Sequence, residues 1–217
     1  MKISTDFLPE KTKKLFEFFS GEKFIDDYVL VGGTALSLSL EHRLSEDLDF
    51  IYYGKELDVK KINRFINKSF PNNYKLLKKD DNHQLDYLIG GVKVTFFTTD
   101  AVSVNFDVKE YSNKHKNLRI ADYKIISVLK ILAISQRSTI RDYYDLFYIA
   151  DKVFPLNKIF KLSKKLLPEL SEITYKETLI YTDDISEEKI SDLLEPKIKI
   201  SKQDIAEFFK KELLKLK

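Results

Sequence analysis

The chain has 217 residues, of which 43% are hydrophobic and 33% are charged, with only 6 glycines and 5 prolines. This composition excludes an intrinsically disordered chain, and the length allows one large domain or two modest ones with a buried core. Cysteine is absent, which excludes disulfide bonds, thiolate metal ligands and a cysteine nucleophile. Such a chain suits a reducing compartment, so we expect a cytoplasmic protein.

The formal net charge of +3 does not by itself indicate a nucleic-acid partner, because lysines and acidic residues alternate along most of the chain. The first residues lack the apolar stretch and the cleavage site of a secretory signal. No apolar run reaches the ~18 residues that a membrane-spanning helix needs. We therefore expect no membrane partner.

The spacing of apolar residues predicts alternating helices and strands in the first half. In chain order these are a helix over Leu8–Phe19, a strand over Tyr28–Val31, a helix that opens at Gly32-Gly33, a strand over Asp47–Tyr53 and a helix over Asp58–Phe70 with Asp58 as its N-cap. Three or four further strands are predicted, with candidates over Tyr74–Leu77, Gln84–Ile89, Val92–Thr98 and Val102–Val108 and with Gly90-Gly91 as the hairpin turn between the middle pair. The order of these elements predicts a mixed sheet.

The second half has helical periodicity with few strand signals. The predicted helices cover Tyr123–Gln136, Thr139–Val153, Leu156–Leu167, Glu172–Tyr181, Glu187–Leu194 and Lys202–Leu216, with a short polar turn at Arg137-Ser138 and prolines between later helices. The predicted fold class is therefore α/β (α+β). A domain with a mixed sheet and flanking helices occupies residues 1–119, and a C-terminal helical bundle occupies residues 120–217.

The segment Val31-Gly32-Gly33-Thr34 has the outline of a phosphate site, because a strand ends in two glycines and a hydroxyl residue opens a helix. Glycine lets a phosphate approach the backbone, and the helix N-terminus offers free N–H groups. The structural alternative is a simple turn between a strand and a helix, and the segment alone does not decide between the two.

Asp47 and Asp49 follow on the next predicted strand, where residues i and i+2 share a face. Carboxylate pairs of this kind bind hard divalent cations, although Asp-x-Asp also occurs on solvated strand edges. The apolar neighbours Leu48, Phe50 and Ile51 indicate a core strand, in which acids without a cation or partner would be costly. The pair therefore favours a metal site.

Together these residues resemble the nucleotidyltransferases of the DNA polymerase β superfamily, with their Gly-Gly or Gly-Ser, helix, and Asp-x-Asp strand. The chain is more closely similar to the AbiEii/AbiGii-type toxin nucleotidyltransferase family, in Gly32-Gly33-Thr34-Ala35-Leu36 and in His42-Arg43-x-Ser45-x-Asp47-Leu48-Asp49. In the second half, Lys130, Arg137, Arg141-Asp142 and Asp145-Leu146 are similar to that family's lysine, arginine and Arg-Asp-x-x-Asp-Leu run.

The resemblance implies a Mg²⁺ cofactor, with Mn²⁺ as a possible substitute, held by Asp47 and Asp49. It implies catalytic roles for these two residues and for Lys130 and Asp145. The nucleotide-binding set that it implies is Gly32, Gly33, Thr34, Arg43, Ser45, Arg137 and Arg141. Within this set, Gly33 and Thr34 would cradle the β and γ phosphates, and Arg43 and Ser45 would orient the Asp47 loop.

The charged residues of the second half have a simpler interpretation as well. Lys130 and Arg137 lie seven apart, and Arg141 and Asp145 four apart, so each pair can share a helix face. Such spacing also occurs on solvated faces with surface ion pairs. The aromatic neighbours of Asp145 favour a packed helix, whose lysine and arginines could hold triphosphate oxygens. His42 is expected to be a packing or hydrogen-bonding residue and not a ligand.

The chain departs from the superfamily pattern at Thr95, where many members carry a third carboxylate that binds metal and acts as the base. Either Asp145 takes the base role, or the metal alone deprotonates the acceptor, or activity is lost. Retention of the other motif residues favours an active enzyme.

The predicted function is transfer of a nucleoside monophosphate from a nucleoside triphosphate to a hydroxyl of RNA, such as the 3′ end of tRNA, by the toxin of a toxin–antitoxin pair. Its partners are thus the triphosphate, the RNA and a cognate antitoxin. Two alternatives stay open: a small-molecule nucleotidyltransferase similar to those that modify aminoglycosides, and a catalytically silent nucleotide-binding module. The sequence does not decide the preferred base, the acceptor or the oligomeric state.

Overall fold

The computed structural model describes residues 3–181, 185 and 195–216. The chain forms two compact units. The first contains Met1–Leu40 and Ser45–Asp122, and the second contains Glu41–Leu44 and Tyr123–Lys217. The short loop 41–44 therefore belongs to the second unit by its contacts, although the residues on both sides of it belong to the first.

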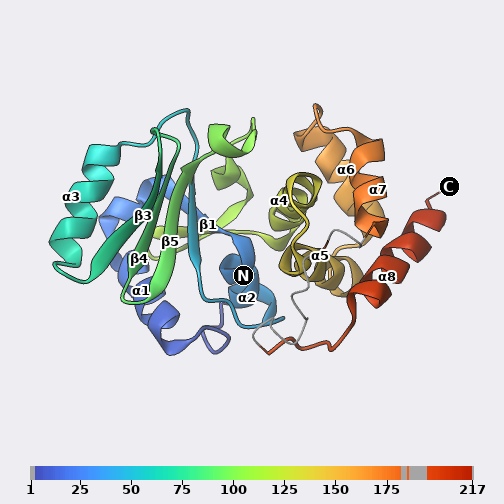
Figure 1. Cartoon of the computed structure of the whole chain (residues 1–217), viewed down its shortest axis with the longest axis horizontal. Coiled ribbons are helices and arrows are strands. Elements are labelled where there is room, and N and C mark those ends of the chain that lie inside the picture. The colour runs from blue at the N-terminus through green and yellow to red at the C-terminus, as the bar shows by residue number, and fades with distance from the viewer. Residues whose placement is uncertain (1–2, 182–184, 186–194, 217) are drawn as a thin grey trace. The chain divides into compact units, whose positions relative to one another are not determined.

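The first unit is built on a seven-stranded mixed sheet in the order β3-β4-β5-β2-β1-β7-β6 (Figure 1). Its strands are β1 (Tyr28–Val31), β2 (Leu48–Tyr52), β3 (Tyr74–Asp80), β4 (Gln84–Ile89), β5 (Val92–Thr98), β6 (Ser112–His115) and β7 (Leu118–Ala121). Strand β1 pairs antiparallel with β2 and parallel with β7, and β2 pairs parallel with β5. The predicted mixed sheet is thus confirmed.

Helices α1 (Glu10–Gly21) and α3 (Val59–Ser69) cover one face of this sheet (Figure 1). Aromatic side chains fill the space between them and the strands. Phe24 stacks on Phe65 of α3 with ring centroids 4.0 Å apart, and Phe19 of α1 packs against Phe50 of β2 at 5.1 Å. Neighbouring residues of a strand point to opposite faces of the sheet. The alternate side chains of β2 and β5 therefore lie on the other face and take no part in this aromatic core.

Two predictions about local structure in the first unit, a helix cap and a hairpin turn, are confirmed. The side chain of Asp58 caps α3 by accepting a hydrogen bond of 2.9 Å from the Lys61 N–H. Gly90 and Gly91 both have positive φ, 57° and 88°, in the hairpin between β4 and β5. Backbone angles of this kind match the twist of two-residue hairpins and are open to glycine without a Cβ clash.

The predicted strand over Val102–Val108 is wrong. This segment holds two short 3₁₀ turns, Asp100–Val102 and Val108–Tyr111, and Ser103 between them is left-handed with φ 55°. Its valines were a misleading strand signal, because Val104 and Val108 are buried without entering the sheet. The hairpin of β6 and β7 was missed, since β6 has the polar sequence Ser-Asn-Lys-His and its place depends on the pairing of β7 with β1.

In its described part, the second unit is built mainly of helices. These are α4 (Tyr123–Gln136), α5 (Ile140–Lys152), α6 (Leu156–Leu166), α7 (Glu172–Ile180) and α8 (Lys202–Leu214). Helix α4 is the central element, because it packs against α5, α6 and α7, and α8 packs against α5 and α7. The predicted helix over Glu187–Leu194 lies outside the described residues. Among the described helices, none combines the length and the apolar character that crossing a membrane requires.

The first unit contains two further elements near the site. A 3₁₀ turn over Lys23–Asp27 leads into β1, and α2 (Gly32–Leu40) starts directly where β1 ends. Helix α2 is almost wholly apolar, and Ala35, Leu36 and Leu38 are buried. The polar residues of the motif, at the start of α2 and at the start of β2, therefore lie next to a tightly packed core.

Candidate active site

Gly32 and Asp49 are direct neighbours in the first unit. The antiparallel pairing of β1 with β2 places Val31 opposite Asp49, so the glycine that follows β1 meets the Asp49 side chain. A Cβ atom built on Gly32 would lie 2.8 Å from Asp49 Oδ2, closer than such contacts permit, and Gly32 has φ +72°. Glycine is required here both for the backbone angle and for the approach of the carboxylate to the start of α2.

Asp47 lies one residue before β2, and the chain that leads to it is tied to the start of α2. The Thr34 hydroxyl donates a short hydrogen bond to the Asp47 carbonyl and lies 2.9 Å from Ser45 Oγ. The Thr12 hydroxyl donates to the Glu46 carbonyl at 2.7 Å. These bonds fix the backbone of residues 45–47, while Asp47 itself stays half-buried, as Asp49 does.

The position of the Thr34 hydroxyl bears on its predicted role. Thr34 is only 1% exposed, and its hydroxyl is used by Ser45 and Asp47. In this arrangement the residue positions the chain that leads into β2, and a phosphate would meet backbone N–H groups of α2 in place of the hydroxyl. The phosphate contact predicted for Thr34 stays a prediction, as does that for Gly33.

Thr95 lies beside Asp49 on the next strand, where the superfamily pattern has a third carboxylate. The register of β2 with β5 pairs Asp49 with Thr95, and that of β5 with β4 pairs Thr95 with Asp86. Thr95 is 5% exposed, and its Oγ1 has no hydrogen-bond partner within the described part of the chain. A polar row therefore crosses three strands on the face opposite the aromatic cluster.

Asp86 is a buried acid of this row that the sequence analysis did not single out. Its carboxylate lies 3.2 Å from Lys93 Nζ and accepts a hydrogen bond of 2.7 Å from Gln84 Nε2. The signal was present in the alternation of β4, where Gln84 and Asp86 fall on one face, but polar residues in a short strand are common on solvated faces. Pairing with Lys93 gives Asp86 a structural partner.

The donor set around Gly32 fits a magnesium ion carried by a nucleotide. Mg²⁺ usually takes one or two carboxylates from the protein and fills its other positions with water and substrate phosphates. Asp47 and Asp49 supply two half-buried carboxylates, and that of Asp49 lies against the backbone at the start of α2. A protein cage of three or more acidic, histidine or cysteine ligands is absent among the described residues, so a substrate would have to complete the coordination.

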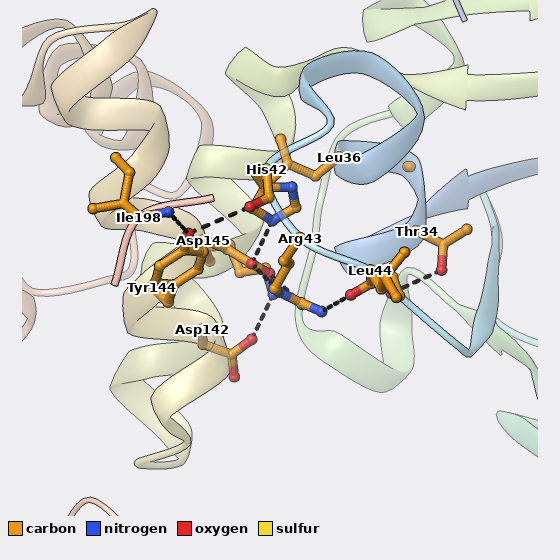
Figure 2. Close-up of polar contacts among 12 residues, drawn as sticks. Thr34, Leu36, His42, Arg43, Leu44, Asp142, Tyr144, Asp145 and Ile198 are labelled. Atoms are coloured by element: carbon orange, nitrogen blue, oxygen red, sulfur yellow. Dashed lines mark hydrogen bonds and ion pairs between the residues drawn. The ribbon is translucent and has the colours of Figure 1, made fainter. Parts of the chain in front are cut away.

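Asp145 is the centre of a buried charge cluster in the second unit (Figure 2). Its Oδ1 atom lies 2.7 Å from His42 Nε2 and 2.8 Å from Arg43 Nε. Its Oδ2 atom lies 3.0 Å from Arg43 Nη2 and 2.6 Å from Lys130 Nζ. Helix α5 thus presents one carboxylate to three basic side chains, two from the loop 41–44 and one from α4, and none of Asp145 is exposed to solvent.

Asp142 lies one turn earlier on α5 and completes the cluster. It accepts hydrogen bonds from Lys130 Nζ at 2.7 Å and from Arg137 Nε at 2.9 Å, and a short one from the Thr139 hydroxyl. Arg141, its neighbour in the sequence, is exposed. The interpretation of this motif as a solvated face is therefore wrong for Lys130, Asp142 and Asp145, which are all buried.

The mutual compensation of these charges sets their pKa values. Burial alone would raise the pKa of Asp145, but Arg43 and Lys130 outweigh it and hold that pKa well below its usual range. Burial would likewise raise the pKa of Asp142, whereas Lys130 and Arg137 lower it to about 2. Burial would lower the pKa of Lys130, but the two carboxylates raise it. All three groups stay charged at neutral pH.

His42 behaves as the hydrogen-bonding residue that the sequence analysis expects. Burial lowers its pKa, and this effect exceeds the opposing influence of Asp145. The ring is therefore neutral, with Nε2–H donating to Asp145. The carbonyl of His42 accepts a hydrogen bond of 3.3 Å from the Tyr144 hydroxyl (Figure 2). It also accepts one of 2.9 Å from the Lys197 N–H, so the loop is held on its backbone as well.

The motif residues thus fall into two groups. The structure brings Gly32, Thr34, Ser45, Asp47 and Asp49 together in the first unit, and Arg43, Lys130, Arg137 and Asp145 together in the second. Arg141 lies in the second unit with an exposed side chain. The catalytic and nucleotide-binding roles of all these residues stay predictions.

A glycine turn that opens a helix beside an acidic strand of a mixed sheet defines the nucleotidyltransferase fold class. The chain belongs to the AbiEii family of nucleotidyltransferase toxins: the family's sequence model, described as "Nucleotidyl transferase AbiEii toxin, Type IV TA system", matches residues 13–216. The predicted family is thereby confirmed. Membership makes the chain a nucleotidyltransferase toxin of the type IV toxin–antitoxin class, with a nucleoside triphosphate substrate and an antitoxin partner.

One sequence relative and two solved structures illustrate what the chain is similar to. The uncharacterized protein aq_aa25 of Aquifex aeolicus (strain VF5) is 32% identical over 192 residues, which cover 87% of each chain. The fold is similar to that of MenT4, the nucleotidyltransferase toxin Rv2826c of Mycobacterium tuberculosis H37Rv, with a TM-score of 0.56, 12% identity and coverage of 96% of this chain and 87% of that one. JHP933 from Helicobacter pylori has a TM-score of 0.52 at 20% identity, covering 99% and 96%.

Proposed function

We propose that the protein transfers a nucleoside monophosphate from a nucleoside triphosphate to a hydroxyl of RNA, with the 3′ end of tRNA as the acceptor, and that the reaction requires Mg²⁺. The observation that carries this proposal is the contact of the Asp49 carboxylate with Gly32 at the start of α2. It puts an acid able to hold a cation next to backbone N–H groups able to hold phosphate. The motif also lies in a chain of a nucleotidyltransferase family.

The proposed reaction is a displacement at the α-phosphorus of the triphosphate. The acceptor oxygen forms a new P–O bond, the bond to pyrophosphate breaks, and the acceptor proton is released. When bound, Mg²⁺ supplies charge neutralisation on the transferring phosphoryl group. Asp47 and Asp49 hold the ion and orient the triphosphate, and N–H groups of the first turn of α2 bind phosphate oxygens without a side chain at Gly32 in the way.

The direct test is a transfer assay with each labelled nucleoside triphosphate, Mg²⁺ and total RNA. Wild type is expected to label RNA of tRNA size, and chelation of divalent cations is expected to abolish the label. Asp49→Ala should lower transfer at least about 100-fold, the scale of removing a group that stabilises transition-state charge. The matched control is Asp80→Ala, which removes an exposed acid at the end of β3. No transfer by folded wild type with any of the four nucleotides would contradict the proposal.

Acceptor identity can be separated in the same assay. Label on small molecules such as aminoglycosides, with none on RNA, would contradict the proposal that RNA is the acceptor. The proposed nucleotidyl transfer itself would still hold. Metal-dependent nucleotide binding without transfer to either acceptor would identify a silent binding module. In cells, induction of wild type is expected to arrest growth, whereas induction of Asp47→Ala is expected not to.

A further inference from the structure

We infer that Asp145 is a positioning residue: it anchors loop 41–44 and thereby fixes the chain that continues to Asp47, and it does not accept the proton of the acceptor hydroxyl. This inference rests on the proposed function, because it assigns a role within the same reaction. It differs from the expectation that Asp145 replaces the carboxylate missing at Thr95.

The hydrogen bonds of Asp145 leave no oxygen for a proton or a metal ion. An ionised carboxylate has about four lone-pair sites. Four donor contacts occupy them: His42 Nε2 and Arg43 Nε at Oδ1, and Arg43 Nη2 and Lys130 Nζ at Oδ2. A general base must reach the proton that it abstracts and needs a pKa near the working pH. Asp145 is fully buried and saturated, so it meets neither condition.

The same contacts are well suited to hold a loop. Arg43 binds both oxygens of Asp145, a bidentate geometry that fixes direction as well as distance, and its Nη1 donates to the Leu44 carbonyl at 2.9 Å. The carbonyl of His42 is bound by Tyr144 and by the Lys197 N–H. Residues 42–44 are thus fixed by side-chain and backbone contacts.

The chain continues from Leu44 directly into the segment that carries the proposed metal ligand. Ser45, Glu46 and Asp47 are each tied by a hydrogen bond to a threonine hydroxyl, either Thr34 or Thr12. Only three residues separate Arg43 from Asp47. Loss of the anchor at Arg43 would release one end of this short segment, and the position of Asp47 would then depend on the threonines alone.

Two variants test the inference without relying on activity. Asp145→Asn removes the negative charge, and Arg43→Lys keeps the loop's positive charge but removes its bidentate contact. Hydrogen exchange of the amides of residues 42–47 is expected to accelerate at least about tenfold in both variants relative to wild type. The amides in the middle of α4 are expected to stay protected. Unchanged exchange of residues 42–47 in folded Arg43→Lys would overturn the inference, even if Asp145→Asn does not fold.

Activity measurements then separate positioning from proton transfer. For a positioning role, Arg43→Lys and Asp145→Asn should lower kcat to a similar extent, their double variant should lose little more, and the acid limb of the pH–rate profile should keep its midpoint. Disappearance of that limb in Asp145→Asn, with normal kcat in Arg43→Lys, would overturn the inference and make Asp145 the base. If wild type transfers nothing, the proposed function fails, and the exchange result alone decides the inference.

Discussion

The carboxylates of the two units differ in their burial and in the side chains that surround them. In the first unit, Asp47 and Asp49 stay half-buried, and the Asp49 carboxylate lies against the backbone of Gly32. In the second unit, Asp142 and Asp145 are buried and surrounded by basic side chains at 2.6 to 3.0 Å. The sequence predicts that both motifs act in one reaction, yet the surroundings of the two pairs suit different roles.

The difference shows what an acidic motif needs in order to act on a substrate. A carboxylate can ligate a cation only if some of its lone pairs are available when the cation arrives. A carboxylate whose lone pairs are all used stabilises the groups that use them, and removal of one partner leaves the other charges buried without compensation. We therefore expect substitutions in the second unit to affect folding first, and substitutions in the first unit to affect chemistry first.

The largest expected effect is the loss of stability in Asp145→Asn. This change leaves Arg43 and Lys130 buried with one negative charge fewer, and the free energy of unfolding should fall by about 3–5 kcal/mol. Urea denaturation followed by circular dichroism measures it. The matched control is Asp151→Asn, which changes a less buried acid at the end of the same helix, paired with the exposed Lys152, and is expected to leave the transition unchanged. A loss below about 1 kcal/mol would show that the cluster is not structural.

The next effect is on activity and belongs to the first unit. Asp47→Asn is expected to reduce nucleotidyl transfer at least about 100-fold, because the amide cannot supply the negative charge that the cation needs. The urea transition should stay within about 0.5 kcal/mol of wild type, as for half-buried positions away from a packed core. Equal losses of activity and stability would erase the distinction between the two regions.

Acid should weaken the second unit in two stages. Because burial lowers the pKa of His42 below 6.5, the stability that its neutral form provides is complete above that pH and is lost as the pH falls further. For Asp142, burial acts upward but Lys130 and Arg137 lower the pKa from 3.8 to about 2. Its contribution, on the order of 2 kcal/mol, is present above pH 3.8 and is lost as the pH falls toward 2.

Urea midpoints measured from neutral pH down to about pH 2 follow both stages. Asp142→Asn is expected to reduce the lower stage, to which Asp145 also contributes because its pKa is lowered too, and to leave the upper stage in place. A pH dependence of Asp142→Asn identical to that of wild type would show that this carboxylate does not carry the acid sensitivity.

The smallest effect concerns the glycine turn. Gly32→Ala places a Cβ atom against Asp49 Oδ2 at a residue with positive φ, and we expect a loss of about 1–2 kcal/mol together with a displaced carboxylate and reduced transfer. Gly21→Ala is the matched control, because a Cβ atom there meets no atom within 4 Å. If the two variants behaved alike, the close approach of Gly32 to Asp49 would have no functional meaning.

Much of the fold follows from local patterns in the sequence. Strands β4 and β5, their glycine hairpin, the cap at Asp58 and helix α4 were all predictable, because each depends on periodicity or on a turn residue within a few positions. The hairpin of β6 and β7 was not, since polar residues form it and a distant strand holds it. The segment at Val102–Val108 shows the converse error, in which β-branched residues serve burial and not pairing.

The same division applies to the candidate site. The contact of Gly32 with Asp49 lies within a short stretch and could be inferred from motif spacing. The contact of Arg43 with Asp145 joins residues 102 positions apart, and no local signal distinguishes a buried anchor from a charged helix face. The hydrogen bond from the Thr34 hydroxyl to the Asp47 carbonyl could not be predicted either, because a hydroxyl after two glycines is equally suited to bind a phosphate.

Calorimetric titration of wild type and Asp49→Asn with a nucleoside triphosphate, in Mg²⁺ and in chelator, tests most directly whether the first unit holds the metal-bound substrate. We predict binding to wild type in Mg²⁺, no binding in chelator, and no binding to folded Asp49→Asn in either buffer. Binding of the triphosphate to Asp49→Asn with wild-type affinity in Mg²⁺ would contradict the account.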